Sequence, residues 1–112
     1  MRTLRQGLIW SLLIIPALAG AQNARTFTGV LTDSECPTAD HSRMQMGPTD
    51  AECTRACVRV HGATYVLYDG KKAYTLSGSK ALDQFAGQKV TVRGALNAKT
   101  LTIQVASVAA AK

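Results

Sequence analysis

Two segments near the C-terminal end of the chain alternate strictly between apolar and polar side chains. In the first segment Val90, Val92, Gly94 and Leu96 point one way, and Lys89, Thr91 and Arg93 point the other. Residues 100–105 place their apolar side chains at the odd positions. Period-two alternation is typical of strands that turn one face to a core and the other to water. The three residues between them, 97–99, are enough to connect the strands as a hairpin. The chain is therefore expected to build a sheet with one buried face.

Three further segments have the composition of strands, and two have the signals of helices. Strands are expected at 26–32, 63–68 and 72–76, and Asp69-Gly70 supplies a turn between the last two. Thr49 and Glu52 match a capping box, and Gly62 suits a helix end, so a helix is expected between them. Its predicted buried face holds Cys53, Ala56, Cys57 and Val60. A second, short helix is expected from about Ser79 to Ala86, with Leu82 and Phe85 buried.

This order of elements predicts the fold class. Five strands, with a helix between the third and the fourth, follow the order of an OB-fold. We therefore expect a mainly β protein, a small five-stranded OB-like barrel. The Cys-containing helix is expected between strands 1 and 2. At 112 residues the chain fits one domain, and its last residues, 109–112, are expected to fray.

The first residues of the chain carry the pattern of a secretory signal peptide. Arg2 and Arg5 precede an apolar stretch at 8–18, and the small residues 19–21 follow it. We expect a signal peptide at 1–21 and a single domain at 22–112, with Asn23 or Arg25 as alternative starts. The apolar stretch is shorter than the roughly 18 residues of a membrane span, so no span is expected after cleavage. The mature chain is expected in the periplasm or outside the cell.

Charge argues against a nucleic-acid partner. The full chain carries a formal net charge of +6, and removal of Arg2 and Arg5 leaves 11 basic against 7 acidic residues, a net +4. Binding of single-stranded nucleic acid requires basic residues grouped with stacking aromatic residues. In this chain the charges are scattered. The expected partners are a metal ion or another protein, and the mature chain is expected to be monomeric.

The chemically distinctive residues lie close together in the connection between the first two expected strands. Over 22 residues, 36–57, the chain holds three Cys, one His and two Met: Cys36, His41, Met44, Met46, Cys53 and Cys57. Two interpretations follow, a disulfide and a metal site.

The disulfide is the simpler interpretation of three Cys in an exported chain. Cys53 and Cys57 are one helical turn apart, which separates their Cβ atoms by about 5–6 Å, more than a disulfide prefers. Cys36 is therefore expected to pair with Cys53 or Cys57, and the sequence leaves open which. On this interpretation the cysteines serve only to stabilise a structural or protein-interaction domain through a disulfide bond.

The metal interpretation uses the same spacing. Two ligands at i and i+4 on a helix face one point, and Cys36 and His41 complete a set suited to zinc. Met44 and Met46 carry soft thioethers, which favour copper(I). The spacing C-x4-H-x11-C-x3-C matches no standard zinc finger.

Each loop residue also has an ordinary interpretation. His41 alone is typical of a solvated surface histidine, and the two Met residues are typical of gap-fillers under a loop. Asp33 fits a turn residue that caps the loop, or a group that orients a metal ligand. A spare thiol near positive charge suggests a redox role as a third alternative. No catalytic signature is present, so a binding or accessory role is expected rather than an enzyme.

Several of these segments also resemble known proteins. Residues 28–36, His41, residues 53–58 and residues 62–67 are similar to a group of small secreted bacterial proteins, frequent in acidobacteria and other soil bacteria. Residues 82–94 are similar to the helix-then-strand passage of bacterial OB-fold domains. The resemblance covers nearly all of the mature chain. It implies an OB-like fold and an exported location, and it implies no activity.

Overall fold

The computed structural model describes residues 23–78 and 81–112. A helix, α2 (Asp50–His61), and a 3-10 turn, η1 (Leu82–Phe85), interrupt a series of strands. The strands are β1 (Ala24–Asp33), β2 (Tyr65–Tyr68), β3 (Ala73–Ser77), β4 (Lys89–Asn97) and β5 (Thr102–Ala110). The predicted signal peptide falls on residues outside these ranges. No helix in the described part of the chain is long and apolar enough to cross a membrane.

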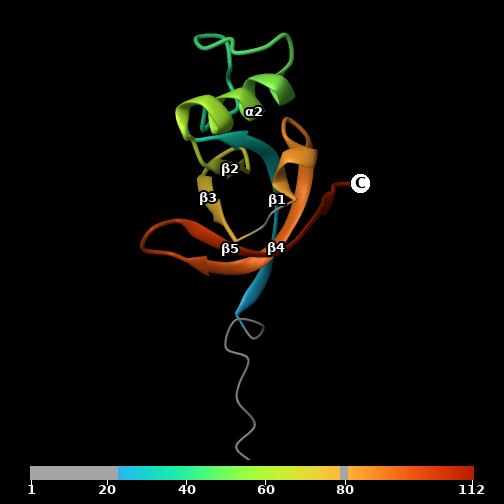
Figure 1. Cartoon of the computed structure of the whole chain (residues 1–112). Coiled ribbons are helices and arrows are strands. Elements are labelled where there is room, and N and C mark those ends of the chain that lie inside the picture. Colours follow the sequence, from blue (N-terminus) through green and yellow to red (C-terminus); the bar gives the residue numbers. More distant parts are fainter. Residues whose placement is uncertain (1–22, 79–80) are drawn as a thin grey trace, which may run out of the picture.

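The five strands form one sheet that closes on itself. Neighbours follow the order β1-β2-β3-β5-β4, and β4 pairs again with β1. The β3–β5 pair is parallel, and the other pairs are antiparallel. Figure 1 shows α2 and the loop before it at one end of this ring, with the β4–β5 hairpin at the opposite end. Because closure pairs the outer strands with each other, the sheet needs no other cover for its edges.

The core fills the inside of the ring, as the alternating pattern predicts. Val90, Val92 and Ile103 are fully buried. The buried cluster comprises Leu31, Leu67, Tyr74, Leu76, Leu82, Val90, Val92, Ile103 and Val105. Leu101 is an exception to the predicted face: it is exposed, has a φ of 51° and lies in the turn before β5. The turn takes this residue out of the strand, so the alternation begins only at Thr102.

The C-terminal end of β5 is longer than expected. Ala109 and Ala110 pair with Thr91 and Val90, and the Ala111 N–H donates to the Lys89 carbonyl. The prediction that residues 109–112 fray is therefore wrong for Ala109 and Ala110. The composition of this segment did not predict the pairing, because small residues alone bury little apolar surface. In the structure, the start of β4 supplies the hydrogen-bond partners of their backbone groups.

The caps of α2 are those the sequence indicates. Thr49 Oγ1 accepts a hydrogen bond from the Glu52 N–H at 3.2 Å, and Gly62 ends the helix in the left-handed conformation. The buried face differs from the prediction at three positions, one of which is Ala56, which is only half-buried. Val60 is 68% exposed, whereas Thr54 is fully buried beside Cys53. The helix is rotated so that positions 53, 54 and 57 face inward, which leaves Val60 on the outside.

The second predicted helix is shorter than expected. Within the described residues it is the single 3-10 turn of η1, whereas Ser79, the expected start, lies outside them. Leu82 is buried and Phe85 packs against the core, as predicted. Two contacts hold the turn: the Tyr65 hydroxyl donates to Asp83 Oδ1, and Arg55 Nε donates to the Asp83 carbonyl at 2.9 Å.

The Tyr65 contact gives a testable pH dependence. Burial, and then the hydrogen bond to Asp83, raise the pKa of the Tyr65 hydroxyl. A raised folded-state pKa stabilises the fold below the unfolded value of about 10, and this stabilisation is lost as the pH rises above it. We expect an absorbance titration at alkaline pH to contain a late tyrosine component that Tyr65→Phe removes. Tyr68→Phe is the control, and loss of the late component in that variant instead would contradict the assignment.

Candidate metal centre

The end of β1 is folded around the side chain of Asp33. Asp33 is fully buried, and its Oδ1 accepts hydrogen bonds from the N–H groups of Glu35 at 2.9 Å and Cys36 at 3.1 Å. The Thr32 hydroxyl donates to the Cys36 carbonyl at 2.7 Å. These bonds confirm that Asp33 caps the loop, and they hold Cys36 against the end of the strand.

The following turn brings His41 back to the same place. Ala39 adopts a φ of 61°, a conformation that non-glycine residues rarely take, and its N–H donates to the Cys36 carbonyl. His41 is only 8% exposed, so the interpretation as a solvated surface histidine is wrong. Its Nε2 lies 3.5 Å from the hydroxyl of Thr54, which is fully buried on α2. The helix therefore covers the imidazole that the loop delivers.

Asp33, Cys36 and His41 form a compact group of three ligand-type side chains. One ligand atom from each lies within 4.8 Å of the other two. Ligands bonded at about 2.0–2.3 Å to one ion in a tetrahedral arrangement are about 3.3–3.8 Å apart, so this group would close by up to about 1 Å on binding an ion. All three side chains are buried.

Two atoms of this group lack the partners that buried polar atoms require. Among the described residues, Asp33 Oδ2 and His41 Nδ1 are the buried side-chain atoms without a hydrogen-bond partner. Such atoms are rare because each leaves a desolvation cost of about 1–3 kcal/mol uncompensated. Both atoms belong to the same three-residue group, which makes this group the candidate site for a ligand.

Burial, and then the nearby negative charge, favour the protonated form of the Cys36 and Cys57 thiols. Burial is the largest cause that raises the pKa of Cys36, and the Asp33 carboxylate is the next. Burial, then Asp33 and the neighbouring thiols, raise the pKa of Cys57 to about 12. A cation would reverse this preference, since it stabilises thiolates and carboxylates alike.

The other candidate ligands lie beside the Asp33–Cys36–His41 group and contact one another. They are Met44, Met46, Cys53 and Cys57. The Cys53 thiol donates to the Met44 carbonyl at 2.8 Å and accepts from the Met46 N–H at 3.4 Å. The Cys57 thiol lies 3.9 Å from the Met44 thioether sulfur. The half-buried Met44 thus contacts both helix thiols, whereas the Met46 contact is made by its backbone.

The three cysteines are free thiols in this structure. Cys36, Cys53 and Cys57 are all buried, and the expected pairing of Cys36 with Cys53 or Cys57 is not formed. The thiols of the helix are instead engaged with Met44, as described above.

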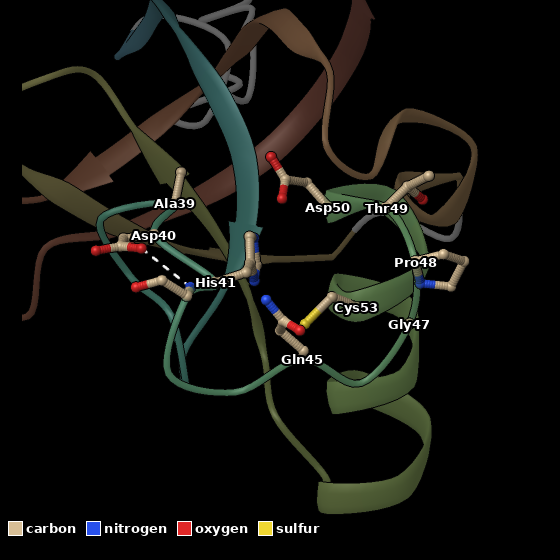
Figure 2. Close-up of a pocket in the computed structure, with 10 residues that line it drawn as sticks. Ala39, Asp40, His41, Gln45, Gly47, Pro48, Thr49, Asp50 and Cys53 are labelled. Carbon is tan, nitrogen blue, oxygen red and sulfur yellow. Dashed lines mark hydrogen bonds between the residues drawn. The ribbon is translucent and has the colours of Figure 1, made fainter.

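A polar pocket opens beside this centre. It has a volume of about 370 Å³, and its lining includes His41, Gln45, Asp50 and Cys53. Figure 2 shows Cys53 reaching from α2 toward the loop that carries His41 and Gln45. A second depression of about 330 Å³ is lined by Cys36 and Met44, with Glu35, Asp40 and Arg43 nearby. His41 and Cys53 therefore line the first pocket, and Cys36 and Met44 line the second.

The sequence identified Cys36 and His41 as candidate ligands but did not include two further side chains of the candidate centre, Asp33 and Thr54, among the ligands. Asp33 was expected to cap the loop or to orient a ligand, and it is a member of the group itself. Thr54 was not considered because a threonine inside a helix carries no metal-site signal. The available signal was an acidic residue three positions before Cys36, at the end of a strand.

Comparisons of this chain with protein-family models, with curated proteins and with solved structures find no match, so the interpretation of the centre rests on its own geometry.

Proposed function

We propose that this protein is a small exported module that binds one borderline divalent metal ion, zinc first, through Asp33, Cys36 and His41. The observation that carries the proposal is the pair of buried, unpartnered atoms in this group, Asp33 Oδ2 and His41 Nδ1. An ion between them would satisfy both atoms and would convert the adjacent thiol to a thiolate.

The donor set favours zinc over copper for this group. It combines a carboxylate oxygen, a thiolate sulfur and an imidazole nitrogen, all of which zinc accepts. Copper(I) prefers sulfur donors, and a carboxylate is a poor ligand for it. Charge supports the same choice, because a divalent ion neutralises one carboxylate and one thiolate in a buried site, where net charge is costly.

An OB-like fold and export complete the proposal. The strand order and the closed sheet support an OB-like topology, since that fold is a five-stranded Greek-key barrel. In that fold the connection between the first two strands frames the binding face, and the proposed ligands lie on it. Export is supported by the signal-peptide pattern at 1–21, and the resemblance to secreted acidobacterial proteins points the same way.

The test is a zinc titration of the mature chain purified from the periplasm under reducing conditions. We expect one bound zinc ion by native mass spectrometry and a higher melting temperature at saturation, because an ion that binds only the folded state stabilises it. Zinc should also protect Cys36 from alkylation, and the intact mass should place the N-terminus near Gln22. Absence of any bound ion, with unchanged melting, would reject the metal proposal.

The structural staple is the second candidate, and the same sample tests it. It is favoured by the burial of all three thiols at this end of the molecule, Cys36 beside the end of β1 and Cys53 and Cys57 on the inner face of α2. A chain isolated without reductant would then be lighter by two hydrogens, with one reactive thiol and no zinc binding. The reduced, zinc-loaded chain is the outcome expected of a metal module.

A further inference from the structure

We propose a second metal position, a soft site for copper(I), formed by the sulfur atoms of Met44, Cys53 and Cys57. It shares no ligand with the Asp33–Cys36–His41 group. It therefore goes beyond the zinc function proposed above, and either proposal can fail without the other.

The distance between two of these sulfur atoms fits a shared ion. The Cys57 Sγ and Met44 Sδ atoms are 3.9 Å apart. Two sulfur ligands at about 2.3 Å from one ion in a trigonal arrangement are separated by about 4.0 Å. Cys53 stands one helical turn before Cys57 on the same buried face of α2, so its thiol approaches the same point.

The loop before α2 holds the Cys53 sulfur in place. Residues 44 and 46 contact Cys53 Sγ from two sides, through the Met44 carbonyl at 2.8 Å and the Met46 N–H at 3.4 Å. An ion would replace the thiol proton that now points to the carbonyl. The N–H donor would remain, and such donors stabilise a sulfur that carries negative charge.

The chemistry of the donors selects the class of ion. Two thiols and one thioether are soft ligands, which favour copper(I) over zinc, calcium or magnesium. Both thiols are buried, at 1% exposure for Cys53 and 0% for Cys57, so water cannot readily displace them. Met44 lines the depression that also contains Glu35 and Asp40, and their carboxylates give a cation a route to the thioether.

The two methionines provide a matched pair for the test. We would measure copper(I) affinity of the reduced mature chain under anaerobic conditions, by competition with a chromophoric copper(I) chelator. Met44→Leu keeps the shape of the side chain and removes the sulfur, and we expect about a tenfold loss of affinity. Met46→Leu should retain the wild-type affinity, because only the Met46 backbone contacts Cys53. X-ray absorption at the copper edge should detect sulfur neighbours only.

Asp33→Asn separates this site from the zinc group. It should lower zinc affinity by at least about 100-fold. Copper(I) affinity should change far less, because Asp33 acts on Cys57 only through its charge. Equal copper(I) affinity in the two methionine variants would overturn the proposal. A nitrogen or oxygen neighbour of copper, together with loss of copper(I) in Asp33→Asn, would instead place the ion in the zinc group and would also overturn it. Failure of copper(I) to bind the wild-type chain at all would reject the site outright.

Discussion

Asp33→Asn is expected to lower zinc affinity by at least about 100-fold while leaving the fold intact. The substitution removes an anionic oxygen ligand and its charge. It keeps a carbonyl oxygen that can accept the N–H groups of Glu35 and Cys36, so the loop cap survives. Zinc affinity measured by competition with a chromophoric chelator gives the result directly.

The same variant should be slightly more stable than the wild type when no metal is present. Asp33 is fully buried, and its Oδ2 has no hydrogen-bond partner. Replacing this buried carboxylate, one oxygen of which has no partner, by a neutral amide should raise the free energy of unfolding by about 1 kcal/mol. Asp40→Asn is the matched control, because Asp40 is exposed and neighbours the same loop. Equal zinc affinity in the Asp33 variant and the wild type would remove Asp33 from the ligand set.

Gly94→Ala is expected to destabilise the fold by about 3 kcal/mol. A Cβ atom on this residue would lie 2.2 Å from the Gln104 carbonyl oxygen and 2.8 Å from Ile103 Cγ2. The first of these neighbours is backbone of the paired strand, and the second belongs to a fully buried core residue. The β4–β5 ladder, already irregular between Arg93 and Gly94, would have to separate to make room.

Urea denaturation followed by circular dichroism measures this effect. Gly62→Ala is the control, since its Cβ would meet no atom within 4 Å and only the φ of 66° opposes it. The control should lose about 1 kcal/mol, the usual cost of a left-handed conformation for alanine. Indistinguishable midpoints for the two variants would show that the backbone contact at Gly94 is tolerated.

Sequence analysis predicted the strands and the helix caps better than it predicted the arrangement of the candidate site. Alternation predicted the buried faces of β4 and β5, and the cap residues Thr49 and Gly62 predicted the bounds of α2. These signals are short-ranged: each depends on residues a few positions apart, and local geometry determines where their side chains point. Val60 was misplaced because small differences in helix rotation depend on what the helix packs against.

The arrangement of the candidate site, in contrast, depends on contacts between residues far apart in the sequence. The sequence determined that Cys36, His41, Met44, Cys53 and Cys57 lie in one connection, and that two of the thiols share a helix face. Only the tertiary structure decided how they divide: Asp33, Cys36 and His41 form one group, and both helix thiols contact Met44. The reason is that α2 is seated beside the end of β1, across a loop whose path depends on Asp33 and on the left-handed turn at Ala39. Which donors meet is therefore set by long-range packing, which no spacing along the chain specifies.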